Sequence, residues 1–226
     1  MIAWEELPKQ MQSDAVRPYY DLLKKKQISL VLKRCFDVIV SAIMIVILSP
    51  VLLVLAIWIK RDSEGPVFYR QERVTRYGKR FRIFKFRTMV TNADKIGSLV
   101  TIQRDARITK VGHKIRSCRL DELPQLFNVF LGDMSFVGTR PEVPKYVDAY
   151  TDEMWATLLL PAGVTSEASI LYKDEDQLLN CADDVDHVYV QEVLPGKMQY
   201  NLRALREFSF FGDIRTMVRT VFAMYR

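Results

Sequence analysis

The chain has 226 residues, enough for one globular domain with a hydrophobic core, alone or with a membrane anchor. Apolar residues make up 49% of it and charged residues 27%, which excludes a disordered chain, a collagen-like fibre and a polytopic membrane protein. Its 33 Lys and Arg exceed its 27 Asp and Glu, and the net charge of +6 favours a polyanionic partner: nucleic acid, anionic lipid or a phosphorylated substrate.

The N-terminal segment, residues 1–30, is polar and of mixed charge. We expect a peripheral extension here. Its candidate contacts with a membrane interface are Trp4, Leu7 and the Tyr19-Tyr20 pair.

Val38 to Ile59 is a run of 22 residues without a charge. A straight helix of that length measures roughly 33 Å, which is enough to cross the hydrocarbon core of a bilayer. Ser49-Pro50 lies at the middle of the run, where proline removes a backbone donor and bends or breaks a helix. Basic residues flank both ends, so the charge imbalance that orients a spanning helix is missing. We therefore favour a re-entrant helix that breaks at Ser49-Pro50 and leaves by the face it entered, with a single spanning helix as the alternative.

After this run, Gly65-Pro66 marks a turn into a soluble domain. Val67 to Tyr69 is a candidate short strand. Arg80 to Arg87 alternates basic and apolar residues with one slip at Ile83-Phe84, which predicts a strand with a bulge. Tyr77-Gly78-Lys79 is the expected turn before it, so the segment predicts a short β hairpin.

Two helical regions follow. Apolar residues recur every three or four positions from Leu123 to Leu131, and Gly132 is expected to end that helix. Asn201 to Arg226 is a second region, which we expect Gly212 to interrupt. Its apolar and arginine side chains are interleaved, so it packs on the domain or lies in the headgroup layer of a membrane.

Asp121-Glu122 is the acidic pair of greatest interest, because it immediately precedes the helix at Leu123–Leu131. The structural interpretation is helix capping, since Asp is a preferred N-cap and acids suit the positive end of the helix dipole. The functional interpretation uses the same geometry: a helix start accepts a phosphate and keeps a carboxylate ionised, as a nucleophile or as a Mg²⁺ ligand.

Basic residues supply candidate phosphate ligands. Arg70 to Arg87 holds eight Lys and Arg against one acid, Glu72, and part of it is expected to be a solvated or membrane-facing surface. Arg116 lies five residues before Asp121, and Arg140 lies in a Gly-Thr-Arg-Pro loop. Arg offers a fork of donors to a phosphate and Lys a point charge.

The remaining reactive side chains are sparse. Cys35, Cys118 and Cys181 are odd in number and far apart, which predicts neither a disulfide framework nor a zinc site and fits a reducing cytosol. His113 and His187 stand alone, so a histidine-based metal site or catalytic triad is not expected.

Four segments in this order resemble the bacterial sugar transferases, the monotopic phosphoglycosyl transferases that act on polyprenol phosphate. They are KRCFDVIVSAIMIVILSPVLL, GPVFYRQERV, KFRTM and RSCRLDELPQLFNVFLGDMSFVGTRPE. The resemblance covers roughly residues 31–150, with weaker agreement to the C-terminus. The ordered set is far more specific than any one of its motifs.

The resemblance implies transfer of a sugar 1-phosphate from a UDP-sugar to polyprenol (undecaprenyl) phosphate, with release of UMP, at the start of surface-glycan or glycoconjugate assembly. It implies a ping-pong mechanism in which Asp121 is the nucleophile that carries a covalent phosphosugar. Glu122 matches the partner acid, which assists Mg²⁺ binding or deprotonates the lipid phosphate, so both acids are expected metal ligands. The implied location is the cytoplasmic membrane, with the catalytic domain on the cytoplasmic face.

The resemblance also implies substrate-binding residues. Lys85, Arg116, Arg140 and Pro141 fall on positions associated with the phosphates and the nucleotide, and Arg87 of the same basic stretch joins this set. Ser49-Pro50 matches the break of the family's re-entrant helix. The implied partners are the UDP-sugar, polyprenol phosphate, membrane lipid and downstream glycosyltransferases, and no nucleic acid.

The sequence departs from the family pattern in places that leave the sugar open. Thr139 stands where many members have proline, and residues 161–168 match only part of a Pro-Gly-x-Thr-Gly pattern. Lys173-Asp174-Glu175 occupies the neighbourhood of a later Gly-Arg. We expect this region to contribute to the choice of sugar.

The expected fold is therefore α+β and mostly helical. Residues 1–30 form an N-terminal extension, 31–60 a re-entrant membrane helix-break-helix, and 61–226 a small cytosolic catalytic domain with a short β hairpin and interfacial amphipathic C-terminal helices. One alternative is a membrane-anchored, non-catalytic basic module that binds anionic lipid or a partner enzyme, with Asp121 and Glu122 as caps. Another is a tethered nucleic-acid-binding domain, although the chain carries no recognisable motif for one.

Overall fold

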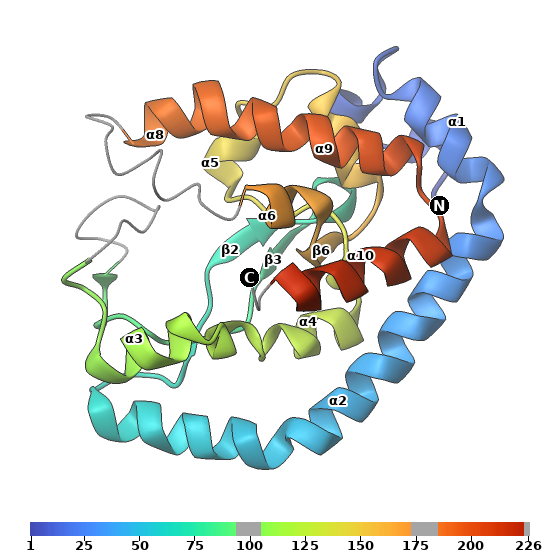
Figure 1. Cartoon of the computed structure of the whole chain (residues 1–226). Helices are drawn as coiled ribbons and strands as arrows, with labels where there is room; N and C mark the ends of the chain where they lie inside the picture. Colours follow the sequence, from blue (N-terminus) through green and yellow to red (C-terminus); the bar gives the residue numbers. More distant parts are fainter. Residues whose placement is uncertain (94–104, 173–184, 224–226) are drawn as a thin grey trace.

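The computed structural model of the chain describes residues 1–93, 105–172 and 185–223. These residues form a mostly helical fold with three small two-stranded sheets (Figure 1), which confirms the expected α+β class. The α-helices are α1 (Arg17–Lys25), α2 (Gln27–Asp62), α3 (Lys110–Ser117), α4 (Gln125–Leu131), α5 (Pro144–Val147), α6 (Glu167–Leu171), α8 (Val185–Val188), α9 (Leu194–Arg206) and α10 (Phe210–Ala223). The short 3-10 turns are η1 (Trp4–Glu6), η2 (Lys9–Met11), η3 (Arg76–Gly78), η5 (Leu120–Glu122) and η6 (Met154–Leu159), and η7 (Tyr189–Val193) is a π-helical turn.

The strands lie in three pairs. β1 (Phe68–Tyr69) pairs antiparallel with β4 (Lys85–Phe86), and β2 (Glu72–Val74) pairs antiparallel with β3 (Arg80–Arg82). β5 (Met134–Val137) and β6 (Ala162–Thr165) run parallel, with Met134 opposite Ala162 and Val137 opposite Thr165. The predicted hairpin turn is confirmed, since Tyr77 and Gly78 adopt φ angles of 59° and 72°.

The slip at Ile83-Phe84 divides the predicted strand into β3 and β4. Asn128 of α4 occupies the interruption: its side chain accepts from the Phe84 N–H at 2.8 Å and donates to the Arg82 carbonyl at 3.2 Å. Asn128 is fully buried, so it satisfies backbone groups that would otherwise have no partner. This contact fixes α4 against the strand that carries Lys85.

Helix α2 is longer and more continuous than expected. It runs through Pro50 as one helix of 36 residues and bends near its middle (Figure 1), so the predicted break is a bend within a helix. Pro50 has no N–H to donate to the Val46 carbonyl, and the Ser49 hydroxyl donates to that carbonyl at 2.8 Å instead. In the described part of the chain, α2 is the single helix long and apolar enough to cross a membrane.

Both arms of α2 pack on the same folded body. In the first arm, Lys33 donates to the Val137 carbonyl at 2.7 Å and pairs with Asp213 of α10, while the Asp37 carboxylate accepts from the Phe136 N–H at 3.1 Å. In the second arm, Leu55 and Ile59 are buried in a cluster with apolar side chains of β4 and α3. The two arms of α2 therefore pack against β5, α4 and α3.

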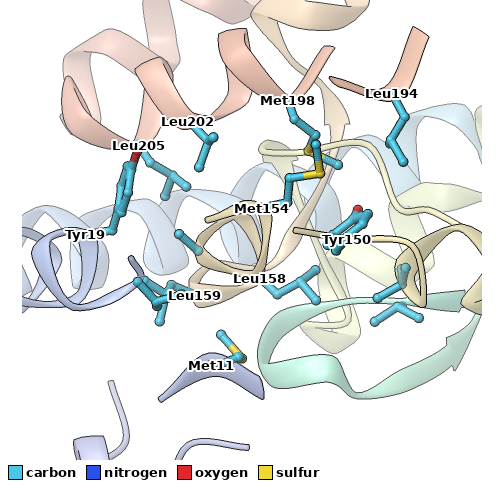
Figure 2. Close-up of a cluster of buried hydrophobic side chains, with 14 of the residues drawn as sticks. Met11, Tyr19, Tyr150, Met154, Leu158, Leu159, Leu194, Met198, Leu202 and Leu205 are labelled. Carbon is cyan, nitrogen blue, oxygen red and sulfur yellow. The ribbon is translucent and has the colours of Figure 1, made fainter. Parts of the chain in front are cut away.

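The N-terminal residues are not a peripheral extension. Leu7, Tyr19 and Tyr20 are almost fully buried, and Trp4 packs edge-on against the Tyr20 ring. They belong to the largest hydrophobic cluster, in which α1 and η2 meet η6 and α9 (Figure 2). The expectation of interfacial contacts from these residues was wrong because their partners are distant in sequence.

The C-terminal break also differs from the expectation. Gly212 lies inside α10, and the chain leaves the helical conformation at Glu207–Ser209 instead. Ser209 starts α10 by accepting from the Gly212 N–H at 3.1 Å, as an N-cap does. α10 has no buried residue and exposes Phe211, Val218, Val221 and Phe222, so it is the amphipathic helix that the sequence indicates.

We expect the buried Lys33–Asp213 pair to be required for stability. Its two side chains are only 8% and 18% exposed, so Asp213→Asn removes the carboxylate that pairs directly with a buried ammonium and should lower the free energy of unfolding by about 3 kcal/mol. Asp21→Asn is the control, because the Arg17–Asp21 pair is about half exposed and should contribute little. Chemical unfolding of both purified variants in detergent measures the difference, and equal losses would contradict the prediction.

Candidate active site

Asp121 and Glu122 lie in a tight turn between two helices. α3 ends at Ser117, Arg119 adopts the left-handed conformation at φ 53°, and η5 carries the two acids. A left-handed non-glycine residue is strained, and such strain is concentrated at functional turns. α4 begins only at Gln125 with Pro124 before it, and neither acid caps it. The capping interpretation of Asp121-Glu122 was therefore wrong.

Glu122 is held by two cations from different parts of the chain. Its Oε1 accepts from Lys85 Nζ of β4 and from an Arg140 Nη in the loop after β5, both at 2.8 Å. The side chains of Lys85 and Glu122 are only 19% and 16% exposed. Burial opposes ionisation of Glu122, but Arg140 and Lys85 outweigh it and hold its pKa well below the usual value. Burial lowers the pKa of Lys85, and the Glu122 carboxylate opposes that shift.

Asp121 differs from its neighbour in its surroundings. In the described part of the chain no side chain donates a hydrogen bond to its carboxylate, whereas Glu122 receives two. Burial raises the pKa of Asp121; the charges of Lys85 and Arg116 oppose that shift, and the Glu122 carboxylate reinforces it. A carboxylate near cations but without a side-chain hydrogen-bond donor keeps its oxygens available to attack an electrophile or to bind a metal.

A cavity of about 750 Å³ brings the predicted site residues together. Asp121 and Glu122 line it, and so do all five of the predicted substrate-binding residues: Lys85, Arg87, Arg116, Arg140 and Pro141. Its volume is in the range of pockets that bind small molecules and cofactors. The acidic pair thus faces a basic cavity, whose described lining also includes Arg73, Arg107, Arg119 and Lys197.

Arg87 has a different position from the other basic residues of this set. One Nη donates to the carbonyl and the hydroxyl oxygen of Ser63 at 2.7 and 2.9 Å, which ties β4 to the residue after α2. Its Nε and its other Nη are buried without a hydrogen-bond partner in the described residues. Arg87 lines the cavity but contacts neither acid. Its hydrogen bonds instead hold the residue that follows α2.

The loop that carries Arg140 is fixed by close backbone contacts with β6. The Gly163 N–H donates to the Thr139 carbonyl at 2.8 Å, and a Cβ at Gly163 would lie 2.1 Å from the Gly138 nitrogen. Residues 161–168, which we expected to affect the choice of sugar, therefore support the Arg140 loop. Lys173-Asp174-Glu175 lies outside the described residues.

Sequence reasoning missed several cavity residues. Arg73 donates to the Pro141 carbonyl at 3.0 Å; the sequence placed it in the basic stretch Arg70–Arg87 but did not single it out. Glu142 is buried next to Tyr189, whose hydroxyl donates to it at 2.7 Å, and Lys197 is buried beside them. Glu142 directly follows Arg140-Pro141, so its place beside two predicted site residues could have identified it from the sequence. No sequence feature marks Tyr189 or Lys197 as a cavity residue.

The two acids fit one mode of Mg²⁺ binding. Among the residues that the structure describes, no three His, Cys, Asp or Glu side chains gather into a site that could hold a metal alone. Mg²⁺ commonly binds through one or two carboxylates together with substrate phosphates. Asp121 and the second oxygen of Glu122 match that donor set in a basic cavity.

Comparisons with known proteins agree with the sequence resemblance. Residues 28–226 match the family model described as "Bacterial sugar transferase". The chain is 34% identical over 194 residues to the "UDP-N-acetylgalactosamine-undecaprenyl-phosphate N-acetylgalactosaminephosphotransferase" of Aeromonas hydrophila, a match that covers 84% of this chain and 43% of that protein. It is 36% identical over 201 residues to the "UDP-glucose:undecaprenyl-phosphate glucose-1-phosphate transferase" of Klebsiella pneumoniae, with 86% and 40% covered.

A shorter relative is the "Putative undecaprenyl-phosphate N-acetylgalactosaminyl 1-phosphate transferase" of Bacillus subtilis, 40% identical over 135 residues, with 60% of this chain and 75% of that protein covered. The chain spans less than half the length of the first two relatives. The family model nevertheless matches most of its residues, from the start of α2 to the C-terminus. The chain belongs to the bacterial sugar transferase family.

Proposed function

We propose that this chain transfers a sugar 1-phosphate from a UDP-sugar to polyprenol phosphate and releases UMP, as the membrane-committed first step of surface-glycan or glycoconjugate assembly. The observation that carries the proposal is the pair Asp121-Glu122 facing a basic cavity of about 750 Å³. A donor with two phosphates and a phosphorylated acceptor both need such an environment. The printed names of the relatives describe reactions of this class.

In the first step, a carboxylate oxygen of Asp121 attacks the phosphorus atom that bears the sugar. A bond from that oxygen to phosphorus forms, the bond from phosphorus to the bridging oxygen breaks, and UMP leaves with the electron pair. Lys85, Arg116 and Arg140 lie around the acids and would bind the phosphate oxygens. Asp121 suits this role because no described side chain hydrogen-bonds its carboxylate.

In the second step, an oxygen of polyprenol phosphate attacks the same phosphorus atom. The bond to Asp121 breaks and its carboxylate is regenerated, so the products are a polyprenyl diphosphate sugar and the free enzyme. Covalent catalysis lets one site serve a water-soluble donor and a lipid acceptor in turn. Glu122 keeps its position throughout because Lys85 and Arg140 both hold it.

Asp121 and Glu122 would hold Mg²⁺ together with phosphate oxygens of the donor. When bound, Mg²⁺ would offset the charge of the phosphates and stabilise the charge that develops on the leaving oxygen. The role of Glu122 is then to complete the cation site rather than to remove a proton, since its two ion pairs stabilise its ionised form.

The membrane arrangement that we propose is re-entrant, with the folded body on the cytoplasmic face. A straight helix of 36 residues would separate its ends by roughly 54 Å, beyond the thickness of a bilayer core. Instead, α2 bends, and both arms contact the same body: Lys33 bonds β5, and Asp62 accepts from the Val111 N–H of α3 at 3.3 Å. Exposed apolar side chains of α2 and α10 would face the lipid.

We expect Asp121, and not Glu122, to become covalently attached to the sugar phosphate. After incubation with UDP-sugar alone, mass spectrometry of the digested protein should show a phosphosugar on the peptide that contains Asp121. Asp121→Asn should lose the adduct and lower UMP release by several orders of magnitude, because the amide is a poor nucleophile. Its unfolding temperature should match wild type or exceed it, since burial disfavours the charge that the substitution removes. An adduct on another residue would overturn this mechanism.

Removal of divalent metal should abolish UMP release. Two carboxylates and two phosphates in one cavity repel each other, and Glu122 already offsets part of the charge of Lys85 and Arg140. Excess chelator should therefore stop the reaction, and added Mg²⁺ should restore it. The unfolding temperature in chelator serves as the control for a loss of fold. Full activity in excess chelator would remove the metal from the proposal.

Cysteines placed at both ends of α2 should report one side of the membrane. Gln27→Cys and Glu64→Cys, at exposed positions in a background without Cys35, Cys118 and Cys181, should resist an impermeant thiol reagent added to intact cells. Both should react after lysis, which controls for accessibility. Labelling of one site alone in intact cells would instead show a single spanning helix.

A further inference from the structure

The cavity extends well beyond the acidic pair. Its second wall comes mainly from elements that carry none of the predicted site residues, namely α5, the segment after α6, η7 and α9, together with Glu142 of the Arg140 loop. Figure 1 shows α9 on the opposite side of β2 and β3 from α3 and α4, between which η5 lies. We call Glu142, Tyr146, Tyr172, Tyr189 and Lys197 the tyrosine–lysine wall.

The wall is a buried and ordered polar surface. Glu142, Tyr189 and Lys197 are only 6%, 5% and 5% exposed, although each lines the cavity. The Tyr189 hydroxyl donates to Glu142 at 2.7 Å, and Lys197 Nζ lies 3.4 Å from that hydroxyl oxygen. A carboxylate, a phenol and an ammonium are therefore arranged in a row.

Aromatic rings frame this row. The Tyr146 and Tyr189 ring centroids are 4.6 Å apart, and the Tyr146 hydroxyl donates to Asp186 at 2.6 Å, which fixes the ring. Tyr172 lies against α9 at Gly196, where a Cβ would come within 2.0 Å of the tyrosine hydroxyl oxygen. Gly196 thus provides the space that Tyr172 occupies.

Local backbone geometry supports a functional position for Tyr189. It begins the π-helical turn η7, and π-helical turns are rare and frequently occur at functional sites. Tyr189 and Lys197 are eight residues apart on adjoining helical segments; the Tyr189 hydroxyl bonds Glu142, and Lys197 reaches that hydroxyl. The wall is therefore built from side chains whose positions depend on one another.

The chemistry of the wall differs from that of the phosphate end. Glu142, Tyr189 and Lys197 offer an acceptor, a hydroxyl and a donor: a carboxylate accepts hydrogen bonds from hydroxyl groups, and an ammonium donates to them. Tyrosine faces pack against the C–H face of a pyranose. A UDP-sugar has two terminal rings, uracil and the hexose, and the hexose is the one that carries several hydroxyl groups for such a wall to hydrogen-bond.

We propose that the tyrosine–lysine wall binds the hexose ring of the donor and determines which sugar is transferred, with Tyr189 and Lys197 as specificity-determining residues. This inference rests on the proposed function, because it assigns the part of a UDP-sugar that is not a phosphate. A site that hydrogen-bonds a particular hydroxyl discriminates against an epimer that places this hydroxyl elsewhere, since that hydrogen bond is then not made.

The test compares purified wild type, Tyr189→Phe and Lys197→Met with Mg²⁺ and polyprenol phosphate. UMP release is measured for UDP-glucose, UDP-galactose and their N-acetylated counterparts, and product inhibition by UMP is measured for each protein. The ratio of kcat/KM between the best donor and its epimer should fall at least tenfold in both variants. Inhibition by UMP should stay unchanged, because the nucleotide binds elsewhere.

Tyr150→Phe is the matched control, since it removes the hydroxyl of a buried tyrosine outside the cavity lining (Figure 2). It should leave the ratio at its wild-type value. Unfolding temperatures identify a variant that does not fold. Tyr172→Phe then replaces that variant, and the same fall in the kcat/KM ratio is expected for it.

The outcomes separate the inference from the proposed function. A uniform loss for all donors with unchanged ratios would show a structural role for the wall and overturn the inference. Weaker UMP inhibition in the same variants would place the nucleotide at the wall and also overturn it. Wild type that releases no UMP with any donor would overturn the proposed function itself.

Discussion

The candidate site depends on one carboxylate that is shared between two cations. Glu122 connects Lys85 of β4 with Arg140 of the loop after β5, and it lies in the turn between α3 and α4. The two ion pairs of Glu122 thus hold β4, the η5 turn and the loop after β5 together. Because the charges are largely buried, removing one partner leaves an uncompensated charge, which is a strong constraint on the arrangement. Asp121 takes its position from the same turn without taking part in the pairing.

Local signals in the sequence predicted the elements around this point well. Gly132 ends α4 in the left-handed conformation at φ 91°, as its placement after an apolar helix indicated. The irregular spacing at Ile83-Phe84 marked the place where Asn128 enters the strand. Lys85 and Arg140 were named from the sequence, but their joint contact with Glu122 could not be, because spacing along a chain does not give the pairing of side chains.

Features that depend on distant contacts were predicted poorly. Tyr19 and Tyr20 are polar-tipped residues in a charged segment, which suggested an interface, but α9 and η6 provide apolar surfaces that bury both. Ser209, rather than Gly212, divides the C-terminal helices because a capping hydroxyl outweighs the helix-weakening effect of one glycine. Tyr189 and Lys197 reach the cavity through a π-helical turn, which carries no local sequence pattern.

The apolar helix and the site are linked by the same backbone. Lys33 of α2 donates to the carbonyl of Val137, and Arg140 follows three residues later in a loop whose Thr139 carbonyl is bonded to Gly163. At the other end of α2, the Ser63 carbonyl accepts a hydrogen bond from the guanidinium of Arg87, and Arg87 lies two residues after Lys85. Each cation that binds Glu122 therefore lies within three residues of a contact with α2 or its end. The contacts that position α2 and those that position the acidic pair therefore lie on the same short stretches of backbone.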